Sequence, residues 1–255
     1  MTSPCIEYTE VIKTLRINGR TFRTRFKAPK IASVVKAGQF VMLSIGEALD
    51  PLLPRAFSVC DVKDESIELL YVAVGKGTSR IAQMRGGEKA RLVGPLGNGF
   101  PIVGKLEVVW IVVGGSGAAV LPILTQSIKK AGASYRIFYG ARTGGELIGF
   151  EDIVFEAATD DGSAGFSGNV IELTKKELKQ TRPDRIFVCG PMPMLRAAQR
   201  EFSDVKETYI SVETPMACGI GLCQGCAVKR SDTDDYFLAC KDGPVFRSDQ
   251  IVLEE

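Results

Sequence analysis

Four cysteines near the C-terminus are the residues whose type and spacing point most directly to chemistry. In the order C-x4-C-x2-C-x13-C, they are Cys218, Cys223, Cys226 and Cys240. This is the ligand order of plant-type 2Fe-2S clusters. The glycines that separate the thiols are Gly219, Gly221 and Gly225. Because glycine lacks a Cβ, they let the backbone wrap a cluster and turn its amides toward the sulfurs. The motif therefore predicts a one-electron carrier.

Two other uses of these thiols are less favoured. A structural zinc site of four thiolates usually contains two C-x2-C pairs, whereas here the first pair is widened and Cys240 stands alone. Disulfides are disfavoured because the first residues, MTSPCIEYTE, are polar rather than signal-like and because the cysteine count of 7 is odd. We therefore expect a soluble, cytoplasmic protein in which Cys5, Cys60 and Cys189 are reduced.

Composition narrows the function classes further. The chain has 255 residues, of which 45% are apolar and 24% charged, and this suits two compact domains. No run approaches the ~20 apolar residues of a membrane span, and a net charge of +2 with scattered basic residues does not indicate nucleic acid. The chain has no histidine, which excludes Ser-His-Asp and Cys-His hydrolases and His-zinc catalysis. Cofactor chemistry is the main remaining expectation.

The elements that must position such cofactors change type before the midpoint. Short strands bounded by Gly, Pro and charged turns indicate a barrel-like all-β region; they cover 38–45, 55–62, 66–74 and 89–97. From Glu107 onward, a strand, a Gly-rich turn, a helix and a second strand indicate a βαβ unit over 107–140. Further strands are expected over 152–159, 184–190 and 207–213, and further helices over 169–180 and 193–202.

Two Gly-rich segments could hold phosphate. Gly114, Gly115 and Gly117 follow an apolar strand and precede a helix, so their amides could face a pyrophosphate. The segment is not a complete G-x-G-x-x-G, and a tight strand-to-helix turn explains the glycines equally well. Arg55, at the start of the RAFS segment, could pair with a phosphate beside the GKGTS segment 75–79, although a surface charge is the simpler interpretation.

Several motifs in one order resemble a known family. They are RAFS, LYVAVGKGTS, GPLGNGF, VVGGSG, ATDDGS, VCGPMPML and ETPMACGIGLCQGC. Together they cover about the whole chain and resemble the electron-transfer subunit of dihydroorotate dehydrogenase B, within the ferredoxin-reductase-like flavoproteins. The resemblance implies an N-terminal FAD-binding antiparallel β-barrel (1–103), a central Rossmann-like parallel α/β domain for NAD (104–208) and a small 2Fe-2S-binding extension (209–255).

The resemblance also assigns residues to cofactors. For FAD they are Arg55, Ala56, Phe57, Ser58, Leu70, Tyr71, Val72, Gly77 and Thr78; for NAD they are Gly114, Gly115, Gly117, Cys189 and Gly190; for the cluster they are Cys218, Cys223, Cys226 and Cys240. Arg55 would bind the FAD pyrophosphate, and Phe57 stands where the family often has Tyr, which removes a phenolic hydrogen bond. Leu70 and Val72 would contact FAD through their backbones. No catalytic acid or base is expected, because the cofactors carry the electrons.

The partner and the nucleotide are the remaining expectations. The family implies an FMN-containing catalytic subunit that interconverts dihydroorotate and orotate in pyrimidine biosynthesis, in a heterotetramer of two subunits of each kind. Alternatives are a flavin and iron-sulfur subunit of a sulfhydrogenase or a bifurcating transhydrogenase, a redox-sensing module that is not an enzyme, and a zinc-stabilised binding module. The family favours NAD, while the sequence offers both Arg142 and Glu146 beyond the second strand of the βαβ unit and leaves NADP open. Asp160 and Asp161 lie beside the dinucleotide or in a solvated turn.

Overall fold

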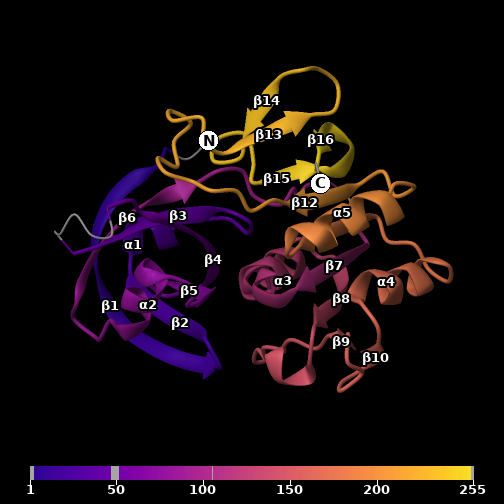
Figure 1. Cartoon of the computed structure of the whole chain (residues 1–255), viewed down its shortest axis with the longest axis horizontal. Helices are drawn as coiled ribbons and strands as arrows, with labels where there is room; N and C mark the ends of the chain where they lie inside the picture. Colours follow the sequence, from indigo (N-terminus) through magenta and orange to yellow (C-terminus); the bar gives the residue numbers. More distant parts are fainter. Residues whose placement is uncertain (1–2, 47–51, 105, 254–255) are drawn as a thin grey trace.

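The computed structural model describes residues 3–46, 52–104 and 106–253. Figure 1 shows three parts, with a barrel on the left in indigo and magenta, an α/β sheet on the right, and a yellow C-terminal segment above both. The expected fold class is confirmed. Within the described residues no helix combines the length and the apolar composition needed to cross a bilayer.

The barrel consists of six antiparallel strands that close in the order β1-β2-β5-β4-β3-β6. Their bounds are β1 Cys5–Asn18, β2 Thr21–Lys27, β3 Phe40–Ile45, β4 Arg55–Lys63, β5 Ser66–Val72 and β6 Lys89–Leu96. The strands expected from the sequence match β3 to β6. The barrel also contains β1, β2 and two helices, α1 Pro29–Ala32 and α2 Lys76–Gln83, that the sequence analysis did not single out.

The second part is a seven-stranded sheet in the order β10-β9-β8-β7-β11-β12-β15. Its strands are β7 Val108–Gly114, β8 Ser134–Ala141, β9 Glu156–Thr159, β10 Phe166–Ser167, β11 Arg185–Cys189, β12 Thr208–Ser211 and β15 Val245–Arg247. All neighbours pair in parallel except β12 and β15. The C-terminal segment therefore supplies the antiparallel edge strand of the central sheet.

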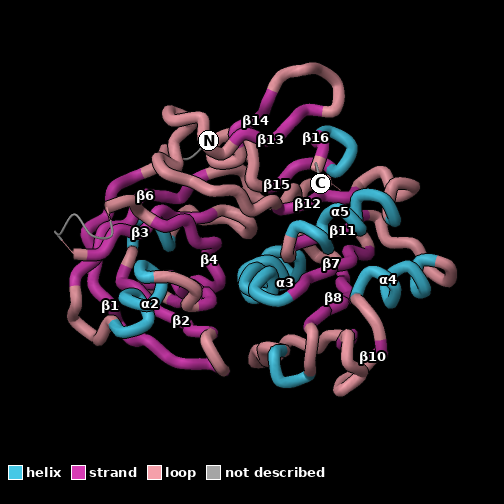
Figure 2. The backbone as a smooth tube through the Cα atoms, in the orientation of Figure 1, coloured by secondary structure: helices cyan, strands magenta, loops and turns pink. Residues whose placement is uncertain are grey.

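Helices cover both faces of this sheet (Figure 2). They are η1 Gly115–Val120, α3 Leu121–Lys130, η2 Gly144–Glu146, α4 Val170–Leu178 and α5 Met192–Glu201. Alternate residues of β7 point to opposite faces, with Ile111 in the core toward the barrel and Trp110 in the core toward α4 and α5. A strand buried on both faces must be apolar throughout, which explains the continuous run VVWIVV.

Two expected elements differ from the structure. The strand expected over 152–159 is wrong in its first half, because Asp152 has a positive φ of 58° and only Glu156–Thr159 forms β9. The apolar side chain of Phe155 instead packs its ring 5.1 Å from that of Tyr139. The helix expected over 118–132 begins earlier, as the 3-10 helix η1 at Gly115.

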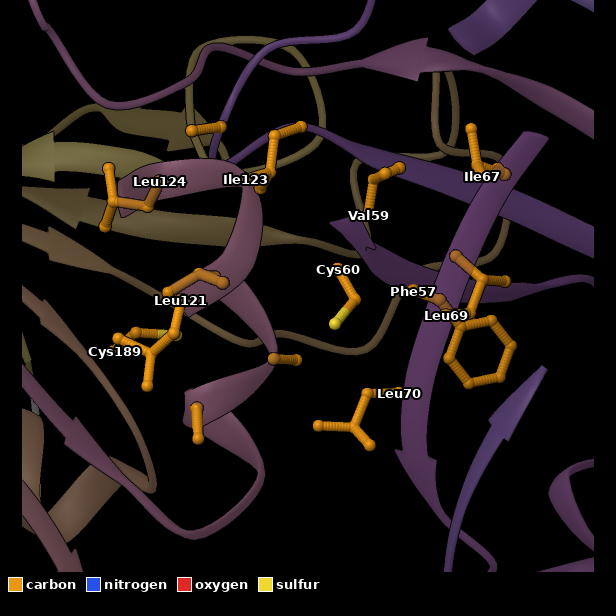
Figure 3. Close-up of a cluster of buried hydrophobic side chains, with 14 of the residues drawn as sticks. Phe57, Val59, Cys60, Ile67, Leu69, Leu70, Leu121, Ile123, Leu124 and Cys189 are labelled. Carbon is orange, nitrogen blue, oxygen red and sulfur yellow. The ribbon is translucent and has the colours of Figure 1, made fainter. Parts of the chain in front are cut away.

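One continuous core joins the barrel to the sheet. Figure 3 shows Phe57, Val59 and Cys60 of the barrel opposite Leu121 and Ile123 of α3. At the edge of this contact the Gln126 amide donates to the Asp61 carboxylate at 3.1 Å. Because the shared residues are fully or largely buried, the two parts pack as one body rather than as domains on a free linker.

The C-terminal segment forms a small sheet, β14-β13-β16. Its strands are β13 Ala227–Arg230, β14 Tyr236–Leu238 and β16 Ile251–Val252, and η3 Ser248–Gln250 precedes the last. Asn98, just after β6, holds this segment to the barrel, since its backbone N–H donates to Gly243 O at 2.5 Å and its side chain to Asp242 O at 2.8 Å. The expected domain boundary at 101–106 is a coil between β6 and β7; Lys105 within it lies outside the described residues.

Candidate functional site

The larger of two cavities lies where the barrel meets the C-terminal ends of β7, β8 and β11. It encloses about 930 Å³. Its walls come from the Gly114–Ser116 turn, the end of β8, the start of α4 and the first turn of α5, with Asn18 to Thr21 of the barrel opposite. In open α/β sheets the crevice beyond the carboxyl ends of the strands is where dinucleotides bind. The cavity is large enough for one.

Gly115 and Gly117, two of the three glycines in the β7–α3 turn, have different structural roles. Gly117 packs against the end of β11, because an added Cβ there would overlap the Cys189 carbonyl. Gly115 has a positive φ of 52°, and an added Cβ would meet no atom within 4 Å. It lines the cavity, so its backbone can be approached closely by a ligand. Gly115 is therefore the glycine of this turn placed to face a pyrophosphate, while Gly117 serves packing.

Asp160 and Asp161, the two aspartates considered for the dinucleotide site, have different surroundings. Asp160, directly after β9, lines the larger cavity. Asp161 instead accepts the hydroxyl and the backbone N–H of Ser163 at 2.6 and 3.0 Å, and these bonds lower the pKa of its carboxyl. Asp161 thus organises a solvated turn, and Asp160 alone remains beside the dinucleotide cavity.

The smaller cavity, of about 370 Å³, lies between β4 and β5 of the barrel and η1 of the sheet domain. The predicted FAD residues that line it are Ala56, Phe57, Ser58, Leu70, Tyr71 and Val72. Both cavities share Val72, Val74 and Ser116 in their walls. A nicotinamide from the larger cavity can therefore meet a flavin in the smaller one at this junction.

The floor of the smaller cavity carries polar groups on β11, β12 and the segment after β12. Burial raises the pKa of the Cys189 thiol to about 12, although the Ser211 hydroxyl opposes the rise, so the thiol is neutral at physiological pH. Desolvation also raises the pKa of Glu213, whose side chain faces the cavity. The Thr214 Oγ1 atom is buried and has no hydrogen-bond partner in the described residues. An unpaired buried hydroxyl here fits a polar ligand such as the flavin ring edge.

Arg55 and the start of α2, predicted to hold the FAD phosphates, lie side by side in the barrel, outside the lining of both cavities. The Arg55 guanidinium lies over Gly77, where an added Cβ would overlap it, and it donates to Leu53 O. The Thr78 hydroxyl accepts the backbone N–H groups of Val74 and Gly75 at 3.0 and 3.1 Å. That hydroxyl therefore stabilises the first turn of α2. Arg55 is the residue of this group whose charge and planar guanidinium suit a phosphate.

The four predicted cluster cysteines gather in two pairs. The Cys226 and Cys240 sulfurs lie 3.3 Å apart, and both residues are buried. In the other pair Cys218 is partly buried and Cys223 exposed, and the Cys223 backbone N–H donates to Cys218 Sγ at 3.4 Å. In the described residues no three Cys, Asp or Glu side chains converge as a single metal ion would require. Two thiol pairs suit two irons that each take two thiolates.

Backbone amides already point at these sulfurs. Gly221 N–H donates to Cys240 Sγ at 3.1 Å, as expected from the sequence, and Ile220 N–H donates to Cys218 Sγ at 3.5 Å. Desolvation opposes ionisation of Cys218, but the N–H groups of Cys223 and Ile220 outweigh it and lower its pKa to about 6. Positive φ values of 72° and 81° at Gly219 and Gly221 make this wrapping possible. At Cys218 the loop thus favours the thiolate, the form that binds iron, whereas desolvation and the neighbouring Cys226 raise the pKa of the Cys240 thiol to about 12.

Some site residues escaped the sequence analysis. Glu213, Thr214 and Met216 line the smaller cavity but lie between a strand and the cysteine motif, where their side-chain direction cannot be read from spacing. Asn18 and Arg20 reach the larger cavity from the β1–β2 turn. The signal for Glu213 in the sequence is its position at the start of the ETPMACGIG motif, five residues before Cys218.

Residues 213–252 match the family model described as the iron-sulfur cluster binding domain of dihydroorotate dehydrogenase B. Over 96% of this chain, it is 36% identical to the electron transfer subunit of dihydroorotate dehydrogenase B (NAD(+)) from Desulforamulus reducens, 97% of which is covered. The subunit of the same name from Bacillus caldolyticus is 34% identical over 92% of this chain and 93% of its own.

A solved structure of an NADH-dependent reduced ferredoxin-NADP oxidoreductase, described for flavin-based electron bifurcation, is also similar. It aligns with a TM-score of 0.82 and 26% identity over 96% of this chain and 90% of its own. A ferredoxin NADP+ reductase from Neisseria gonorrhoeae with bound FAD and NADP shares the fold, with a TM-score of 0.65 and 19% identity over 80% of this chain and 97% of its own. With near full-length relatives above 30% identity, the chain belongs to the family of dihydroorotate dehydrogenase B electron transfer subunits.

Proposed function

We propose that the chain passes electrons between NAD(H) and the FMN-containing catalytic subunit of a dihydroorotate dehydrogenase, by way of FAD and a 2Fe-2S cluster. The observation that carries the proposal is the succession of sites. The two cavities adjoin at Val72, Val74 and Ser116, and the wall of the smaller one includes Met216, two residues before the first thiol, Cys218. The order along the molecule is dinucleotide, flavin, cluster.

The chain's own residues would bind and orient the cofactors. Gly115 would face the pyrophosphate of the dinucleotide from the wall of the larger cavity, which Gly114 also lines. Gly117 sets the turn by packing on Cys189, and Cys189 itself lines the smaller cavity rather than the larger one. Arg55 with Gly77 and the Thr78 turn holds the FAD phosphates, while the β4 and β5 segments flank its ring. Cys218, Cys223, Cys226 and Cys240 hold the cluster. When bound, flavin accepts two electrons as a hydride and passes them on singly, and the cluster carries one at a time.

The described structure also fits a protein that leaves proton chemistry to its partner. Cys189, in the wall of the smaller cavity, stays protonated because burial raises its pKa to about 12. At 3% exposure it gives that wall an uncharged side chain. Distance, orientation and electrostatic tuning are therefore the protein's contribution.

The partner subunit would dock on the tip of the cysteine loop. Ile220 and Leu222 are 56% and 79% exposed, and they lie in the chain between the two more accessible thiols, Cys218 and Cys223. Exposed apolar side chains next to a redox centre fit a protein interface that also excludes water. In this assignment the assembly has two subunits of each kind and works in a reducing compartment such as the cytoplasm, which is supported by seven cysteines described without a disulfide. The proposed domains are 1–103, 104–208 and 209–255.

Reconstitution with an FMN-containing dihydroorotate dehydrogenase catalytic subunit tests the proposal. The complex should couple NADH oxidation to orotate reduction. Cys223→Ser should lower the coupled rate by on the order of 100-fold or more, while NADH still reduces the flavin at a rate within about twofold of the unaltered protein. Cys5→Ser, outside the loop, is the matched control and should change neither rate.

Two results would contradict the proposal. Coupling to no such catalytic subunit, with efficient electron exchange with ferredoxin instead, would favour a role like that of the bifurcating oxidoreductase. Loss of flavin reduction in Cys223→Ser would mean that the cysteine loop supports the fold rather than carrying electrons.

A further inference from the structure

The end of β8 is the part of the larger cavity where the two nicotinamide dinucleotides would be told apart. β8 is the second strand of the βαβ unit, and the residues that follow such a strand contact the adenosine ribose. NAD carries a free 2′-hydroxyl there, and NADP carries a 2′-phosphate. The charged residues of the cavity wall at this end are Arg142, Glu146 and Asp160.

Arg142 is the cation that a 2′-phosphate would need, but its guanidinium is already bound. Its Nη2 lies 2.7 Å from Glu146 Oε1 and its Nε 3.2 Å from Oε2, so both arms of the fork face one carboxylate. The Arg142 pKa is raised, first by this hydrogen bond and also by the charge of Asp160. The side chains of the pair are 79% and 41% exposed, so Glu146 weakens the attraction of Arg142 for a second anion rather than abolishing it.

The turn that carries Glu146 is held in place from two sides. Within η2, the Glu146 backbone N–H donates to Thr143 O at 3.1 Å. From the barrel, the Asn18 amide donates to Gly145 O at 3.1 Å. The backbone of the turn that carries Glu146 is therefore held by the fold and by the contact between the two parts, which keeps Glu146 within reach of Arg142.

The remaining cation of the cavity wall lies toward the flavin. Arg20 donates its Nε to Ala73 O at 2.8 Å, and Ala73 lies between Val72 and Val74, which both cavities share. At the β8 end, therefore, one bound cation faces two carboxylates. A phosphate monoester carries about −1.5 to −2 charge at pH 7 and would meet net repulsion, whereas a ribose hydroxyl can donate to a carboxylate.

We propose that Glu146, by occupying Arg142, acts with Asp160 to make the site selective for NAD(H) over NADP(H). This inference rests on the proposed function, because it places the dinucleotide in the larger cavity. Glu146 is then the specificity-determining residue, and Arg142 is a cation that can bind a 2′-phosphate once Glu146 is neutral. Selection here works by a repulsive element against the wrong ligand as well as by contact with the right one.

Binding of adenosine nucleotides measured by calorimetry tests this without turnover. The probes are 5′-AMP and adenosine 2′,5′-bisphosphate. The unaltered protein should bind 5′-AMP about tenfold more tightly or better, and Glu146→Gln should tighten bisphosphate binding by about tenfold while 5′-AMP changes by less than about twofold. Adding Arg142→Ala to Glu146→Gln should remove the gain. Glu151→Gln makes the same charge change outside the cavity wall and should leave both affinities unchanged.

The same variants measured with NADH and NADPH separate the two claims. Glu146→Gln should raise flavin reduction by NADPH relative to NADH by about tenfold. Equal affinities for the two probes in the unaltered protein, or a Glu146→Gln protein that NADH reduces normally with an unchanged ratio, would overturn the selectivity while sparing the proposed function. A protein that binds neither probe and that neither dinucleotide reduces would overturn both.

Discussion

The cysteine loop and the flavin cavity assemble their residues in opposite ways. Three of the four thiols lie in one loop, and the fourth, Cys240, returns through the β13–β14 hairpin, Ala227 pairing with Leu238. The smaller cavity instead takes residues from Phe40 in the barrel to Pro244 near the C-terminus. The cluster site is therefore local and the flavin site is a product of the whole fold. Damage to the loop should spare the flavin, whereas barrel residues of β3 and β6 share a buried core with Cys226 and Cys240, so damage to those two strands should reach the cluster.

Removal of the iron should give the largest difference between the effect on the cluster site and the effect on the flavin site. A chelator under reducing conditions should lower electron transfer to the catalytic subunit by on the order of 100-fold or more, because the four thiolates lose the cluster that they bind. NADH reduction of bound FAD should stay within about twofold, since the residues predicted to hold FAD lie on β4, β5 and α2, outside the cysteine loop. Iron content, flavin content and both rates are measured on one sample. Release of FAD together with the iron would show that the sites are not independent.

The docking surface should give the next largest effect. Leu222→Asp places a charge on a side chain that is 79% exposed beside Cys223. If the partner covers this loop, affinity for the catalytic subunit should fall about 10- to 100-fold, measured by interferometry or calorimetry. Val154→Asp alters a side chain that is 86% exposed on the α/β domain and is the matched control. Equal effects of the two substitutions would remove the loop from the interface.

Two glycines at the start of α2, Gly77 within the helix and Gly75 just before it, test the flavin side. Gly77→Ala should displace Arg55, because the added Cβ overlaps its guanidinium, and FAD binding should weaken by about tenfold, as for loss of one charge-assisted contact. Gly75→Ala meets no atom within 4 Å and should change FAD affinity by less than about twofold. Affinity follows from quenching of flavin fluorescence, with iron content as the check that the loop is intact. Similar losses in both variants would mean that the helix itself has been destabilised.

The smallest predicted effect concerns the strand that bears the dinucleotide turn. Asp184 accepts the backbone N–H groups of Val108 and Glu107 at 2.9 and 2.7 Å, and these bonds lower the pKa of its carboxyl. Its stabilising effect is thus present above the unfolded-state pKa of about 3.9 and is lost as pH falls through the lower folded-state value. Asp184→Asn should cost about 1 kcal/mol at neutral pH, since the site is exposed.

Urea unfolding of Asp184→Asn at several pH values measures this. The difference from the unaltered protein should shrink as the carboxyl protonates in acid. Asp234→Asn, on an exposed turn, should change the free energy of unfolding by less than about 0.5 kcal/mol. A cost that does not depend on pH would show that the side-chain shape of Asp184 matters rather than its charge.

The same contrast explains what the sequence could and could not predict. The cluster ligands could be predicted because their spacing alone brings three thiols together. Strand β7 could be predicted from its apolar run because both of its faces are buried. Thr214 and Glu213 were not readable, since their direction depends on how the chain leaves β12. The role of Thr78 also needed the structure, because α2 forms from a short polar segment and uses that hydroxyl for its own first turn.

The central claim is that one chain links a nicotinamide site to a cluster through a flavin. An anaerobic titration of the purified protein with NADH, followed by absorbance and electron paramagnetic resonance, tests it most directly. The account predicts bleaching of the flavin band, then the signal of a reduced 2Fe-2S cluster, and loss of that signal alone in Cys223→Ser. A colourless protein that contains zinc, or a flavin that NADH reduces while an intact cluster stays oxidised, would contradict it.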